Sequence, residues 1–127
     1  MGPYLTVPKK EKEVQDGSNA LMGFGACGMQ GWRNTMEDSH IAALDLAPGI
    51  HFFGVYDGHG GNEVAEWVRD NLVGILANLD SFKAGDYELT MKELYIEIDK
   101  ALLTPAVKKK LKDYSQPSQG GSFMSNR

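Results

Sequence analysis

Residues 50–61 read IHFFGVYDGHGG, and this stretch decides the fold because a strand ends in it and a helix begins directly after it. Residues 50–56 are rich in β-branched and aromatic side chains, which predicts a strand that the glycines of DGHGG terminate. Asn62 follows as the expected N-cap of the helix. Apolar residues then recur at spacings of three and four, which predicts one buried helical stripe: Val64, Val68, Leu72, Ile75 and Leu79.

Upstream of this stretch, residues 21–27 (LMGFGAC) and 40–46 (HIAALDL) predict two more strands, separated by a turn over residues 28–35. Pro48-Gly49 predicts the turn into the strand over residues 50–56. Downstream, residues 87–103 and 106–114 predict a second and a short third helix. Strands followed by helices favour an α+β class or a layered α/β arrangement.

The chain divides into three parts. Residues 1–18 are charged and carry Pro3 and Pro8, so we expect a flexible N-terminal arm. Residues 19–114 hold the predicted strands and helices and form the folded part. Residues 115–127 are rich in Ser, Gln and Gly, which predicts a disordered tail.

Composition narrows the function classes. The chain has 127 residues, a formal net charge of -4 and 42% hydrophobic residues, as expected for one soluble domain or part of one. The negative net charge argues against nucleic acid as a partner. Cys27 is the sole cysteine in the sequence, which excludes an intramolecular disulfide and a thiolate zinc cluster. We expect a cytoplasmic monomer, with nuclear or weakly membrane-associated locations as alternatives.

Membrane attachment would require N-terminal acylation. Gly2 and Thr6 satisfy the loose myristoylation pattern. Pro3 disfavours the modification because it stiffens the backbone beside Gly2. The first thirteen residues are polar and charged, and the sequence contains no apolar run long enough to span a bilayer.

The first candidate site is Asp57-Gly58-His59. Asp57 ends a strand, and its carboxylate and the adjacent backbone carbonyl suit a hard cation such as magnesium or manganese. His59 could donate a proton near neutral pH. The alternative is an ordinary strand-to-helix turn, with Asp57 bonded to loop amides and His59 exposed.

The second candidate site is the run from Arg33 to His40 (RNTMEDSH). If it is extended, Arg33 and Glu37 share a face and lie roughly 13 Å apart along the backbone. Arg33 could then hold phosphate oxygens and Glu37 a metal-bound water, with Asp38 in a supporting role. The alternative is a polar entry to a strand with a surface ion pair.

Together, three motifs resemble the metal-dependent protein phosphatase family of type 2C: MQGWR at 29–33, MEDSH at 36–40 and VYDGHGG at 55–61. The resemblance extends to about residue 114. It implies an α-β-β-α sandwich of two antiparallel sheets flanked by helices. It also implies two magnesium or manganese ions, a metal-activated water, and phosphoserine or phosphothreonine in phosphoprotein substrates.

The resemblance assigns a role to each candidate residue. Asp57 would bridge the two ions, and the Gly58 carbonyl would bind one of them. Glu37 would hold a metal-bound water and Asp38 would support the site. Arg33 would hold the substrate phosphate. His59 would protonate the leaving oxygen.

The chain departs from the family pattern near its end. Gly121-Ser122 is followed by Phe123-Met124, where the family continues with Thr-Ala and later aspartates. We therefore expect a truncated sandwich and an incomplete active site, with weak metal binding and little hydrolysis. The alternative function is a catalytically inactive fragment that acts as a binding module or has no function.

Overall fold

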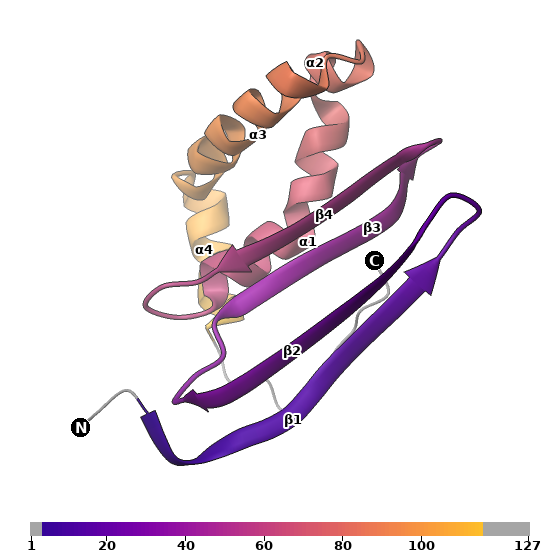
Figure 1. Cartoon of the computed structure of the whole chain (residues 1–127). Coiled ribbons are helices and arrows are strands. Elements are labelled where there is room, and N and C mark those ends of the chain that lie inside the picture. Colours follow the sequence, from indigo (N-terminus) through magenta and orange to yellow (C-terminus); the bar gives the residue numbers. More distant parts are fainter. Residues whose placement is uncertain (1–3, 116–127) are drawn as a thin grey trace.

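The computed structural model describes residues 4–115, and these form strands first and helices second (Figure 1). The predicted α+β class is confirmed. The strands are β1 (Tyr4–Ser18), β2 (Gly23–Arg33), β3 (Asp38–Ala47) and β4 (Ile50–Asp57). The helices are α1 (Glu63–Asn78), α2 (Asp80–Lys83), α3 (Tyr87–Leu102) and α4 (Pro105–Tyr114).

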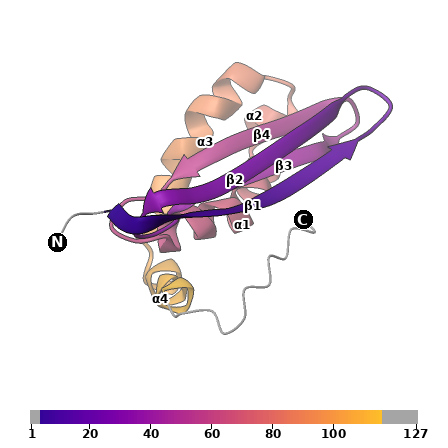
Figure 2. The same ribbon diagram turned by 60° about the horizontal axis from the view of Figure 1, so that its bottom comes forward.

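Within these residues the strands make two antiparallel pairs, β1 with β2 and β3 with β4. Figure 2 shows the β1–β2 pair in front of the β3–β4 pair, with α1, α2 and α3 behind. The described part of the chain is thus layered, with sheet against sheet and helices on the far side. Gly49, at φ 73°, makes the predicted tight turn between β3 and β4.

Two predictions on the N-terminal half are wrong. Residues 4–18 form strand β1 instead of a flexible arm, and β2 runs through the predicted turn as far as Arg33. The two strands pair from Ser18↔Gly23 to Tyr4↔Arg33, with register shifts on either side of Lys9. An exposed edge strand often carries charged side chains, because they prevent it from pairing with other chains. In the sequence, such a charged strand resembles a flexible arm. Hydrogen bonding to β1 keeps the glycine-rich β2 extended.

The core lies between the helices and the β3–β4 pair. Leu72 of α1 and Leu94 of α3 are fully buried, and Ile41 and Phe52 cover them from the strands. The predicted α1 stripe is correct for Val68 and Leu72 but wrong for Val64, which is exposed. Three further α1 residues, Ala65, Trp67 and Leu76, are buried.

Side-chain caps mark the starts of two helices. Asp86 accepts a hydrogen bond from the Leu89 amide at the start of α3, and Thr104 accepts one from the Val107 amide at the start of α4. None of the helices in residues 4–115 combines the length and apolarity needed to cross a bilayer. The acylation pattern at Gly2 and the predicted tail beyond Ser115 lie outside the described residues.

Candidate functional site

The two candidate motifs meet where β3 begins and β4 ends. Asp38 is the first residue of β3, Asp57 is the last of β4, and the two are direct partners in the antiparallel register. Side chains at such positions lie on the same face, with Cβ atoms about 4.5–5.5 Å apart. The β3–β4 hairpin therefore sets two carboxyl groups against each other at one end of the sheet.

The pKa of Asp38 reflects the short distance to Asp57. Partial removal from water raises its pKa first, and then repulsion by Asp57 and a hydrogen bond between the two carboxyl groups raise it further. Glu37 raises the pKa slightly more, while the Arg33 guanidinium lowers it. Asp38, Asp57, Glu37 and Arg33 therefore lie within electrostatic reach of one another.

The two opposed carboxyl groups offer oxygen ligands of the kind that a divalent cation takes. Two carboxyl groups can hydrogen-bond to each other only through a shared proton, since ionised carboxylates are acceptors without a donor. A cation at the same place would remove the repulsion as a proton does, and oxygen ligands are those that magnesium and manganese prefer. Among residues 4–115, however, no group of three or more His, Cys, Asp or Glu side chains is arranged to hold a metal ion.

Gly58 fixes the loop after β4 against the start of β3. Its amide donates to the Glu37 carbonyl at 3.0 Å. A Cβ at this position would lie 2.5 Å from the Glu37 carbonyl oxygen and 2.8 Å from that of Gly61. Only glycine therefore allows the two motifs to approach so closely.

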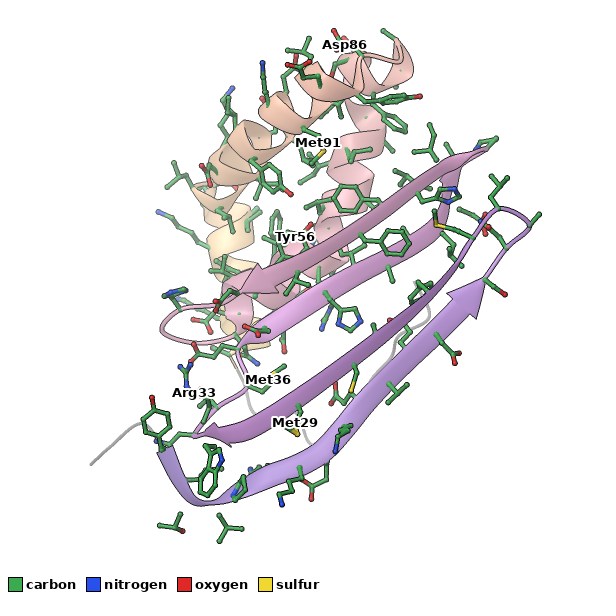
Figure 3. The ribbon with its side chains drawn as sticks, viewed as in Figure 1. Met29, Arg33, Met36, Tyr56, Asp86 and Met91 are labelled. Carbon is green, nitrogen blue, oxygen red and sulfur yellow. The ribbon has the colours of Figure 1, made fainter. Side chains whose placement is uncertain are left out.

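Glu37 and Arg33 each have a supporting contact that the sequence interpretation missed. The Thr35 hydroxyl lies 3.1 Å from Glu37 Oε1, and Gln30 Nε2 donates to the Arg33 carbonyl at 2.8 Å. The only signal for these contacts in the sequence was the position of a hydrogen-bonding side chain, Thr35 two residues before Glu37 and Gln30 three residues before Arg33. Residues 34–37 belong to neither strand, so strand alternation does not place Arg33 and Glu37. Figure 3 shows Arg33 at the end of β2, close to Met36 in the connection to β3.

His59 is exposed, and its Nδ1 lies 3.3 Å from the Asp57 carbonyl oxygen. That contact leaves Nε2 free to face a ligand. Asn62 is at the predicted N-cap, yet its side chain makes no capping bond and donates to Glu66 Oε1 at 2.9 Å. The Gly60 and Gly61 backbones adopt positive φ values of 70° and 135°, which lets the loop turn into α1.

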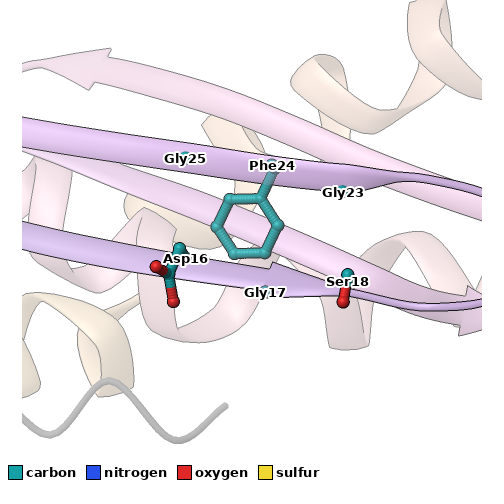
Figure 4. A pocket seen from close by; sticks show the side chains of 6 residues that line it. All are labelled: Asp16, Gly17, Ser18, Gly23, Phe24 and Gly25. Carbon is teal, nitrogen blue, oxygen red and sulfur yellow. The ribbon is translucent and has the colours of Figure 1, made fainter.

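Two hollows lie near the strands. One, shown in Figure 4, is at the β1–β2 hairpin, where Gly17, Gly23 and Gly25 leave the surface open around Phe24. It is at the opposite end of β2 from Arg33, and neither Asp38 nor Asp57 lines it. The other is a groove of about 320 Å³ between β2 and the β3–β4 pair, and Asp38 is among its lining residues.

These features define a class of protein: an α+β domain with opposed carboxyl groups at the end of a hairpin, next to an arginine and a histidine. The family model of protein phosphatase 2C matches residues 22–123. The chain belongs to the protein phosphatase 2C family.

Individual relatives agree. Protein phosphatase 2C 1 of Paramecium tetraurelia is 42% identical over 123 residues, which cover 97% of this chain and 41% of the relative. Probable protein phosphatase 2C 21 of Arabidopsis thaliana is 46% identical over 99 residues, which cover 78% of this chain and 28% of the relative. A probable protein phosphatase of Drosophila melanogaster is 46% identical over 107 residues, covering 84% of this chain and 16% of the relative. The chain thus spans less than half the length of these relatives.

Proposed function

We propose that this chain supplies the cation-binding and phosphate-binding groups of a metal-dependent protein serine/threonine phosphatase. One observation carries the proposal: the register pairing of Asp38 with Asp57 concentrates negative charge at one hairpin end, beside Glu37 and Arg33. A site that pairs carboxylates with a nearby guanidinium suits a ligand with both a cation and a phosphoryl group. Membership of the protein phosphatase 2C family supports the same chemistry.

The groups that would hold a cation are the Asp57 carboxylate, the Gly58 carbonyl and the Glu37 carboxylate. Magnesium or manganese, when bound, supplies a water of lowered pKa for attack on phosphorus. The bond from the Gly58 amide to the Glu37 carbonyl holds the two motifs in place before any cation binds. Asp38 orients Asp57 across the hairpin.

Arg33 and His59 act on the substrate in this proposal. Arg33 presents a planar set of donors to the oxygens of a phosphoserine or phosphothreonine. His59 donates a proton from its ring to the departing serine or threonine oxygen, with its Nδ1 held near the Asp57 carbonyl. The substrates are phosphoproteins, by analogy with the names of the relatives.

The test is phosphate release from a phosphothreonine peptide by the purified chain, with and without Mn²⁺. Because the chain spans less than half the length of its relatives, we expect slow Mn²⁺-dependent release that Asp57→Asn abolishes, that Arg33→Ala lowers by about 10²-fold, and that His59→Gln lowers by about 10²-fold or more. Cys27→Ser is the matched control, because it removes the exposed thiol and should leave the rate unchanged.

Release that persists in Asp57→Asn, or that does not depend on Mn²⁺, would contradict the proposed site. Absence of release together with retained Mn²⁺ binding would favour the alternative function, a catalytically inactive binding module.

A further inference from the structure

The candidate site draws on both strand pairs. Asp57 ends β4 and Asp38 begins β3, whereas Arg33 ends β2 in the other pair. The two pairs are separate sheets within the described residues, and Figure 2 shows one in front of the other. The distance from the Arg33 guanidinium to the two carboxyl groups therefore depends on the side chains that hold one pair against the other, as well as on the short connection over residues 34–37.

A side-chain hydrogen bond joins the two pairs close to the site. Nε2 of His40 in β3 donates to Oε1 of Gln15 in β1 at 2.9 Å, and both side chains are half-buried. Because an amide oxygen is an acceptor, the ring nitrogen carries the proton in this bond. His40 is two residues from Asp38, about 7 Å along the strand, and residues at this spacing share a face.

That face of β3 looks onto the β1–β2 pair. Asp38 and His40 both line the groove of about 320 Å³ between β2 and the β3–β4 pair. Glu13 lies two residues before Gln15 and shares its face of β1. Burial raises the pKa of Glu13 and the His40 imidazole lowers it, so the imidazole is near this carboxyl as well. His40 therefore contacts β1 from the same side of the sheet that carries the acidic end of the site.

A second hydrogen bond between the pairs lies far from the site. Asn19, in the turn between β1 and β2, donates from Nδ2 to Asp45 Oδ1 at 3.1 Å. Asp45 is seven residues from Asp38 in β3, about 23 Å along the strand. This second bond holds the pairs together at their remote end, so the bond made by His40 is the one placed to set their spacing beside the carboxyl groups.

We propose that His40 is a positioning residue, and that its hydrogen bond to Gln15 holds the phosphate-binding Arg33 at a fixed distance from the cation-binding carboxylates. The imidazole touches neither the cation nor the phosphate in this proposal. Loss of the bond leaves the cation site in place, because the β3–β4 register and the Gly58 amide hold it. Phosphate then binds less tightly beside the cation. The inference rests on the proposed function and adds to it a residue that couples its two ligands.

The test is Mn²⁺ titration of the full chain by electron paramagnetic resonance, without and with inorganic phosphate. The measured quantity is the factor by which phosphate tightens Mn²⁺ binding, which is the coupling between the two ligands. Gln15→Leu removes the acceptor and should reduce this factor about three- to tenfold, as the loss of one hydrogen bond does. The affinity for Mn²⁺ alone should stay unchanged. Gln15→Glu keeps an acceptor oxygen and should retain the coupling factor.

Two further variants separate positioning from a general loosening of the fold. Asp45→Ala removes the remote hydrogen bond between the pairs and should leave the coupling factor unchanged. His40→Leu should reduce the factor as much as Gln15→Leu does, and the double variant should show no further loss, since each change removes the same bond.

An unchanged coupling factor in Gln15→Leu, an equal loss in Asp45→Ala, or additive losses in the double variant would each overturn the positioning role. Loss of affinity for Mn²⁺ alone in Gln15→Leu would overturn it too, because the bond would then serve the fold as a whole. A wild-type chain that binds no Mn²⁺, or in which phosphate has no effect, overturns the proposed function together with this inference. Wild type alone therefore distinguishes the two failures.

Discussion

Asp57→Asn should make the fold more stable at neutral pH when no divalent cation is present. Asp38 and Asp57 face each other in the register, at a typical Cβ separation of about 5 Å. Two unit charges at that separation in water repel by about 0.8 kcal/mol, and salt reduces this value. For a chain of 127 residues this corresponds to a rise of ~3 °C in Tm.

The sign of the pH dependence follows from the raised pKa of Asp38. At pH values below its ordinary pKa of 3.8 the carboxyl is protonated in the folded and unfolded states alike, so the repulsion is absent. As the pH rises through that value toward the higher folded-state pKa, ionisation costs more in the folded chain, and wild-type stability falls. The advantage of Asp57→Asn should therefore be near zero at pH 3 and complete at pH 7.

The assay is thermal unfolding followed by circular dichroism, in EDTA and in Mn²⁺. At a cation concentration of about 100 times Kd, binding stabilises the wild-type chain by about 2.7 kcal/mol, and Asp57→Asn should lose this gain. The order of Tm values should thus reverse between EDTA and Mn²⁺. Asp99→Asn, at an exposed position of α3, is the control and should show neither effect. If Asp57→Asn melts below wild type in EDTA, the two carboxylates do not repel each other in the fold; if it keeps the full Mn²⁺ response, Asp57 does not hold the cation.

Three further predictions concern the frame of the site. Gly58→Ala should destabilise the fold by about 1–3 kcal/mol in urea titration, because the new Cβ collides with the Glu37 carbonyl; Gly25→Ala, with no atom within 4 Å of its Cβ, should cost far less. Leu72→Ala should lower the free energy of unfolding by about 2–5 kcal/mol, because that side chain is fully buried. Wild type should lose stability as the pH rises from 10 to 12, because burial and a carboxylate of α1 raise the pKa of the Tyr114 phenol to about 12. Tyr114→Phe should abolish this pH dependence in chemical denaturation.

The sequence predicted the second half of the fold better than the first. The periodic apolar residues of α1 and α3 and the β-branched run of β4 carry their own local signal, and the structure has all three elements. Strand β1 carries none, because Lys9 and its charged neighbours are exposed and hydrogen bonding to β2 alone makes the segment a strand. Pairing between distant segments is not encoded in local periodicity.

The sequence predicted which residues form the candidate site but not how they are arranged. The order of the motifs predicted that Arg33, Glu37, Asp38 and Asp57 belong to one site. The structure brings the four within electrostatic reach of one another. The sequence interpretation gave Asp38 a supporting role without a partner residue. The register instead places Asp38 directly opposite Asp57, a relation that only the hairpin turn at Gly49 determines.

An Mn²⁺ titration of the purified chain by electron paramagnetic resonance, which reads the free ion, tests whether the Asp57 site holds a cation. We expect that wild type removes Mn²⁺ from solution, that Asp57→Asn weakens this binding by at least about tenfold, and that Asp99→Asn does not. Added phosphate should tighten Mn²⁺ binding in wild type and have no such effect in Arg33→Ala. Equal Mn²⁺ affinity in wild type and Asp57→Asn, or no binding by wild type, would contradict the claim that these side chains hold a cation and a phosphoryl group together.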